Sequence, residues 1–208
     1  MSTKASSGTN PQHAAFAGLF ALGVWLTAFG PALPFFARQV DVGLGTAGLL
    51  VTALASGSVA ASLLVSLRLG GVAPRRLIIG GLLLAALGTA CLGVAPGLPL
   101  AIAATAVLGV GDGLVVASGH ALVARTSRDI ASDMNRLNIY FAFGAIAGPL
   151  YAGAVLEATG SLEITYAGIS AFIAAVAVFA VTTPEAPGEA EEHHGPIVLR
   201  PLVVAMGL

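Results

Sequence analysis

Long apolar segments alternate with short polar ones along most of this chain, and the apolar segments are almost free of charge. A membrane-spanning helix needs roughly 20 consecutive apolar residues, and six segments meet that length. They occupy residues 14–36, 45–67, 77–95, 99–124, 137–156 and 164–182. The turn-forming sequence Pro-Gly-Leu-Pro at 96–99 separates the third from the fourth. The pattern predicts six antiparallel membrane helices joined by short loops.

The composition agrees with a chain that lies largely in lipid. Of its 208 residues, 57% are hydrophobic and 9% are charged, whereas a soluble domain usually carries about a quarter charged residues. The first apolar segment is too long for a signal-peptide core of about 7–15 residues, so we expect it to be retained as a span. The net charge of -1 gives no sign of a nucleic-acid partner.

Basic residues are distributed unevenly between the two sets of loops. With a cytoplasmic N-terminus, the cytoplasmic segments hold all but one of the 9 Lys and Arg residues, and the outer loops hold Arg38. The cytoplasmic set is Lys4, Arg68, Arg75, Arg76, Arg125, Arg128, Arg136 and Arg200. Positive residues concentrate in cytoplasmic loops, so the sequence predicts this orientation. Since no transit segment is evident, we expect a bacterial inner membrane.

After the sixth span the chain changes character. An N-terminal tail at 1–13 and a bundle at 14–182 are followed by residues 183–196, which are acidic and rich in proline and glycine. This composition predicts a flexible cytoplasmic linker. The linker contains His193 and His194, which could bind a metal, but no second cluster completes a site. We therefore expect neither a metal nor a cofactor.

Residues 197–208 are apolar again. As a helix they would extend about 18 Å, which is short of the roughly 30 Å membrane core. We expect them to begin a seventh helix, so that the chain is a fragment of a longer protein. A short interfacial helix is the alternative.

Small residues recur at four-residue spacing in several spans, which favours close helix packing in lipid. In the fifth span the sequence from Gly144 to Gly153 reads G-A-I-A-G-P-L-Y-A-G and includes Gly148 and Pro149. Together with six spans, an acidic linker and a nascent seventh helix, this run resembles the amino-terminal half of a major facilitator superfamily transporter. The family pattern is G-x-x-x-G-P-x-x-G-G, in which Ala152 here replaces one glycine.

The loop between the second and third spans is a weaker match to the same family. Alignment of Arg75 and Arg76 with the end of the pattern G-x-L-x-D-R-x-G-R-R keeps Leu69 but puts Gly71 at the acidic position. The carboxylate that latches the cytoplasmic side in the family is therefore missing.

The resemblance implies an all-α membrane protein: a six-transmembrane-helix bundle of two inverted three-helix repeats, forming half of a twelve-helix transporter fold. It also implies that helices one and four line the substrate path. The implied function is secondary active transport of a small solute by alternating access.

Asp112 is the charged residue that interrupts the fourth apolar segment, where it is framed as Gly109-Val-Gly-Asp-Gly113. A charge at this depth is costly, and intramembrane carboxylates usually face cavities. A buried carboxyl group is also suited to binding and releasing protons. We therefore identify Asp112 as a candidate for proton coupling. The alternative is structural, with a protonated Asp112 bonded to a neighbouring helix.

Two further residues are candidates for the substrate and proton pathway. His120 lies about 12 Å along the helix axis from Asp112, too far for direct pairing, and is either a second titrating group or a packed or snorkelling side chain. Trp25 lies within a span rather than at an interface, where tryptophan normally concentrates. It either stacks on a substrate ring or fills the bundle.

The convergent polar groups that catalysis requires are missing from this sequence, as are zinc-protease, hydrolase and phosphate-loop motifs. We predict that the protein is not an enzyme. Its expected partners are the bilayer, a small-molecule substrate, protons, and either a missing carboxy-terminal half or a second copy. A non-transporting scaffold, or a half-unit that works only as a dimer, is the alternative.

Overall fold

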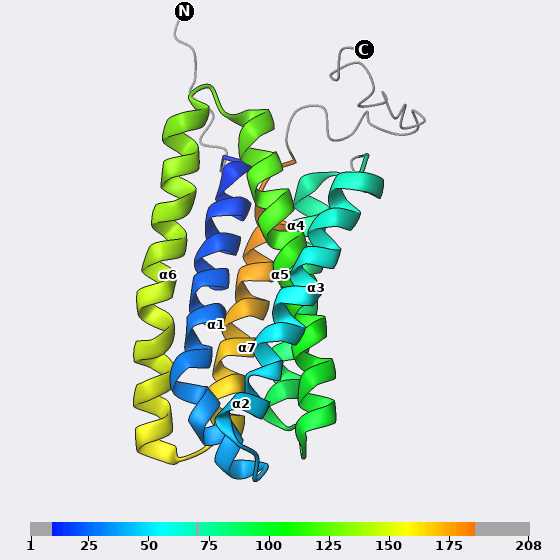
Figure 1. Ribbon diagram of the computed structural model, residues 1–208. Coiled ribbons are helices and arrows are strands. Elements are labelled where there is room, and N and C mark those ends of the chain that lie inside the picture. Colours follow the sequence, from blue (N-terminus) through cyan, green and yellow to red (C-terminus); the bar gives the residue numbers. More distant parts are fainter. Residues whose placement is uncertain (1–9, 70, 186–208) are drawn as a thin grey trace, which may run out of the picture.

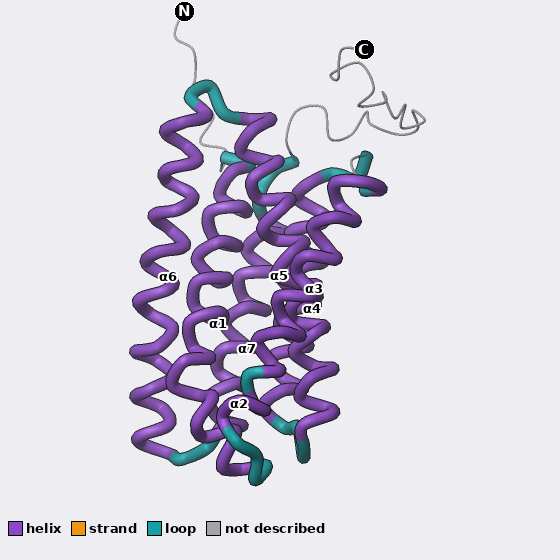
Figure 2. The backbone as a smooth tube through the Cα atoms, viewed as in Figure 1, coloured by secondary structure: helices purple, strands orange, loops and turns teal. Residues whose placement is uncertain are grey.

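The computed structural model describes residues 10–69 and 71–185, and the regular elements of this part of the chain are all helices (Figures 1 and 2). They are α1 (Gln12–Gln39), α2 (Leu44–Ala47), α3 (Leu49–Arg68), α4 (Pro74–Gly93), α5 (Leu98–Thr126), α6 (Ile130–Thr159) and α7 (Leu162–Thr182). Within the described ranges, 6 helical segments are long and apolar enough to cross a membrane. Each of them overlaps one of the predicted spans, so the all-α membrane fold is confirmed.

Several sequence predictions lie outside the described residues. They concern most of the N-terminal tail, the linker from residue 186 onward, His193 and His194, and the seventh helix expected at 197–208.

Helix α6 begins well before the fifth apolar segment, at Ile130 rather than at residue 137. Asp129 caps its start, because the Asp129 side chain accepts a hydrogen bond of 3.2 Å from the backbone N–H of Ser132. The helix ends at Thr159 and is followed by Gly160, whose φ of 64° is the left-handed conformation that glycine adopts most readily. Ser161 then caps α7 through the N–H of Ile164, at 3.2 Å. Polar caps, and not hydropathy, therefore set these helix ends.

The two three-helix repeats, α1–α3–α4 and α5–α6–α7, are interlocked. The most extensive helix contacts join one repeat to the other: α1 packs along α6, α5 along α3, and α4 along both α5 and α7. In Figure 1, α6 and α3 lie at opposite sides of the bundle, with α1 and α5 between them. Exchange of the repeats turns the α1–α6 contact into the α5–α3 contact, as expected of inverted repeats.

Glycines make both of these contacts close. A Cβ atom at Gly144 of α6 would meet the backbone oxygen of Phe20, and one at Gly109 of α5 would meet the backbone oxygen of Leu54. Gly148 lies against the backbone of α1 in the same way. In lipid, small residues let helix backbones approach closely, so these glycines position α1 and α5 within the bundle.

Gly153, the last glycine of the fifth-span motif, differs from Gly144 and Gly148. A Cβ atom there would meet no heavy atom within 4 Å among the described residues. Packing within this part of the chain therefore accounts for the first two glycines of the motif.

One end of the bundle carries Arg68, Arg75, Arg76, Arg125, Arg128 and Arg136, and we call it the basic end. Helix α1 begins there and α7 ends there, at the top of Figure 1. The Arg75 guanidinium caps the carboxyl end of α7: Nε donates to the Ala180 carbonyl at 3.1 Å, and Nη2 donates to that of Val181. Arg75 also pairs with Glu185 at 3.4 Å. Arg75, which the sequence places in a loop motif, therefore links α4 to α7.

A second set of polar contacts at the basic end centres on Asp133, which the hydropathy pattern did not single out. Ser127 Oγ donates to its carboxylate at 2.7 Å, and Gln12 Nε2 at 3.3 Å. Arg136 pairs with the same carboxylate at 3.2 Å. The contacts join the start of α1 to the α5–α6 connection.

Candidate functional site

Asp112 lies within α5 with 6% of its surface exposed. The hydroxyl of Ser58, on α3, donates a hydrogen bond of 2.6 Å to Asp112 Oδ2. Helices α3 and α5 lie close together here because glycines of α5 face α3. A Cβ atom at Gly113 would meet the backbone oxygen of Ser58, and Gly109 lies against α3 one turn away. The close packing of α3 and α5 therefore holds one oxygen of the buried carboxyl group.

The second carboxyl oxygen, Asp112 Oδ1, is buried and has no hydrogen-bond partner among the described residues. The indole Nε1 of Trp25, on α1, is likewise buried without a hydrogen-bond partner among these residues. Trp25 is 1% exposed, and its side chain lies near the Asp112 carboxyl group without a hydrogen bond of normal geometry between them. A buried donor and a buried acceptor from two repeats thus lie near each other without partners.

Ser118 Oγ is a third buried polar atom without a partner in the described part of the chain. It lies on α5, about 9 Å along the helix axis from Asp112 toward the basic end. Buried polar groups in proteins are usually paired, because leaving one unpaired costs free energy of about 1–3 kcal/mol. All three unpaired atoms belong to α1 and α5, so hydrogen-bonding groups that remain available for a ligand lie on these two helices.

His120 is half-buried on α5 and is held by its own helix. Its Nδ1 atom lies 2.7 Å from the Val116 carbonyl oxygen. The structure therefore brings Trp25 toward Asp112 but leaves His120 apart from both, nearer the basic end.

The arrangement can hold a proton or a hydrogen-bonding group at Asp112. Ion pairs within the described ranges join arginines to Glu185 and Asp133, and Asp112 takes part in none of them, so no basic side chain there neutralises its carboxyl group. The same residues contain no cluster of three or more His, Cys, Asp or Glu that could hold a metal ion. The chemistry available at this site is proton exchange and hydrogen bonding.

Ser58 is the site residue that sequence reasoning missed. On the second span, Ala53, Gly57 and Ala61 are small residues at four-residue spacing, which indicates a helix contact face, and Ser58 follows Gly57 directly. A polar residue beside a packing glycine was the available signal. Helix rotation decides whether such a side chain reaches a neighbour, and the sequence alone does not fix that rotation.

Comparison with known families places this geometry in context. The family model described as Major Facilitator Superfamily matches residues 15–206 of the chain. The matched stretch takes in nearly all of α1 and every helix after it. No curated protein matches the chain.

Proposed function

The chain belongs to the Major Facilitator Superfamily of membrane transporters, and from that premise we propose that it moves a small solute by proton-coupled alternating access. The observation that carries the proposal is the pair of unpartnered buried polar atoms, Asp112 Oδ1 and Trp25 Nε1. In inverted-repeat transporters, substrate and coupling-ion sites lie near the bilayer midplane at the interface of the repeats. Asp112 and Trp25 lie on different repeats, within the membrane-spanning parts of α5 and α1.

Asp112 is the coupling residue in this proposal. An ionisable side chain within a membrane is costly, and such residues usually mark ion or proton pathways. Ser58 holds one carboxyl oxygen, while the other is free to accept a proton or a donor from the solute. Trp25 lies near the carboxyl group and contributes to the surface that the solute contacts. His120, which lies between Asp112 and the basic end, is a second proton-binding residue in this proposal.

Alternating access requires further helices that enclose the substrate pathway opposite α1 and α5. Few residues of α3 and α6 are buried, and both helices carry exposed apolar side chains. Exposed side chains include Val59 and Leu63 on α3, and Phe143 and Ile146 on α6. We propose that a second six-helix unit, from the same polypeptide or from a second copy, completes the pathway.

The basic end faces the cytoplasm in this proposal, because positively charged residues concentrate on that side of membrane proteins. The N-terminus of α1 is then cytoplasmic, and the membrane is a bacterial inner membrane. Labelling of single cysteines by a membrane-impermeant maleimide in intact cells tests this orientation. A cysteine at Arg128 should be protected and one at Asp41 should react.

The test of the function is a solute screen with the full-length protein reconstituted in vesicles. Panels of sugars, organic acids, amines and lipophilic drugs are offered with and without an imposed pH gradient. We expect at least one solute to accumulate, and its uptake to collapse when a protonophore dissipates the gradient. Accumulation that is insensitive to the gradient would contradict proton coupling, and binding without uptake would favour a scaffold.

A further inference from the structure

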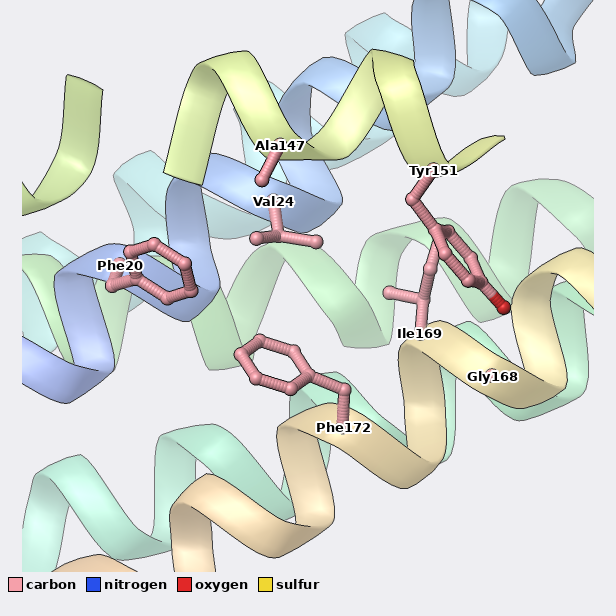
Figure 3. A pocket seen from close by; sticks show the side chains of 7 residues that line it. All are labelled: Phe20, Val24, Ala147, Tyr151, Gly168, Ile169 and Phe172. Atoms are coloured by element: carbon pink, nitrogen blue, oxygen red, sulfur yellow. The ribbon is translucent and has the colours of Figure 1, made fainter. Parts of the chain in front are cut away.

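A lateral groove runs along α1 between α6 and α7, away from Asp112. Its deeper part is a cavity of about 310 Å³ lined by seven residues, among them Val24 of α1, Tyr151 of α6 and Gly168 of α7. Figure 3 shows the side chains around it, with Phe20 and Tyr151 at opposite sides of the space. Apart from the Tyr151 hydroxyl, which lies against Gly168, the lining side chains are apolar.

A second cavity of about 390 Å³ continues the groove toward the basic end. It shares Phe20 and Phe172 with the first, and these two rings meet edge to face with centroids 5.9 Å apart. Its lining extends to His13, at the start of α1, and Phe179, near the end of α7. The groove arises because α6 and α7 each pack chiefly on other helices and little on one another.

The dimensions of the groove match one lipid chain. Between Val24 and His13 it follows α1 for about 16 Å, and from Gly168 to Phe179 it follows α7 for the same length. This distance is about half of the roughly 30 Å membrane core. The groove therefore extends from near mid-membrane to one surface, which is the depth of a single leaflet.

Polar and charged side chains stand at the surface end of the groove. His13 is exposed and lines it directly. Arg136 precedes Tyr140 by one helical turn on the same face of α6, and Tyr140, which lines the groove, stacks on Phe16 at 5.2 Å. The Arg136 side chain is 64% exposed and keeps donors available beyond its contact with Asp133. A guanidinium group is well suited to a phosphate.

We propose that this groove binds one acyl chain of a phospholipid from the leaflet at the basic end, with the lipid phosphate at Arg136 and His13. The Phe20–Phe172 pair lies midway along the bound chain. Bound lipid would fill the gap between α6 and α7 and support the position of α1, which carries Trp25.

The test uses full-length protein in vesicles that contain a trace of phosphatidylglycerol with a photoreactive diazirine in the middle of one acyl chain. After irradiation, mass spectrometry measures the ratio of label on Phe20 and Phe172 to label on Leu83 and Leu87, which are exposed on α4. We expect a ratio well above one. Uniform labelling of these positions would overturn the proposal, as would cross-links showing that another protein segment fills the groove.

Two substitutions with matched controls sharpen the test. Ala17→Trp places a large side chain in the second cavity and should abolish the excess label, whereas Ala90→Trp on the exposed surface of α4 should leave it. Arg136→Gln should lower the ratio about fivefold, the effect of one basic residue near a lipid surface, and Arg128→Gln should not change it. A ratio that survives both Ala17→Trp and Arg136→Gln would overturn the proposal.

Discussion

Ser58 of α3 and Asp112 of α5 are joined by a hydrogen bond of 2.6 Å at the place where glycines bring these helices together. The bond anchors one carboxyl oxygen to the bundle, while the other oxygen is buried without a partner among the described residues. The hydrogen bond links Asp112 to a neighbouring helix, as the structural alternative requires, and the role that we propose for Asp112 in proton coupling rests on the oxygen that the bond leaves without a partner. The hydrogen bond fixes the position of the carboxyl group, and Oδ1 is the oxygen left to bind a proton.

The hydrogen bond between Ser58 and Asp112 should contribute measurably to the free energy of unfolding. We predict that Ser58→Ala lowers the free energy of unfolding by about 1–3 kcal/mol, because a buried acceptor loses its donor. Ser66→Ala is the matched control, since Ser66 is exposed and donates to the Ser62 carbonyl of its own helix at 2.9 Å. Denaturant unfolding in detergent measures both variants. Equal stability of the two would show that the bond contributes nothing.

The two glycines of the α6 motif should respond differently to the same substitution. We predict that Gly144→Ala destabilises the bundle by about 1–3 kcal/mol, the usual effect of overpacking, because its Cβ would press on the backbone of Phe20. Gly153→Ala should be close to neutral, since that position has open space among the described residues. Thermal unfolding of both variants is the measurement. A Gly144→Ala protein as stable as the parent would argue against the close approach of α1 and α6.

The Arg75 cap is the third feature that a substitution can test. The Arg75 side chain is 13% exposed and donates to two α7 carbonyls, whereas that of Arg76 is 61% exposed and lies 3.8 Å from Glu185. Hydrogen bonds to charged groups contribute about 1.5–3 kcal/mol, and exposed ion pairs usually less than about 1 kcal/mol. We therefore predict a larger loss of stability in Arg75→Gln than in Arg76→Gln. Hydrogen exchange at the end of α7 should rise in the first variant alone.

Much of this architecture follows from the sequence, for identifiable reasons. Apolar length alone located the membrane helices, because a bilayer fixes the length of a span. The position of Asp112 within a span was readable in the same way. Helix rotation could not be read in this way, and it decides that Ser58 reaches Asp112 and that Trp25 lies near the carboxyl group. The early start of α6 depends on the Asp129 cap, which a hydropathy pattern does not register.

His120 and Asp112 should differ in their effect on transport. Because the His120 ring is bonded to the Val116 carbonyl of its own helix and stands apart from Asp112, we predict that His120→Ala slows solute uptake but leaves it dependent on the proton gradient. Initial rates in vesicles, measured with and without a pH gradient, distinguish rate from coupling. Gradient-independent uptake in His120→Ala would mean that the coupling group is the histidine.

The central claim is that Asp112 carries the coupled proton, and the most direct measurement is proton movement during solute uptake. A pH-sensitive dye inside vesicles reports it for the parent protein and for Asp112→Asn, with the solute identified by the uptake screen. Circular dichroism and detergent extraction verify that the variant inserts and folds. We predict that the parent moves protons with the solute and that Asp112→Asn does not. A variant that moves solute and protons together at the parent's ratio would contradict the account.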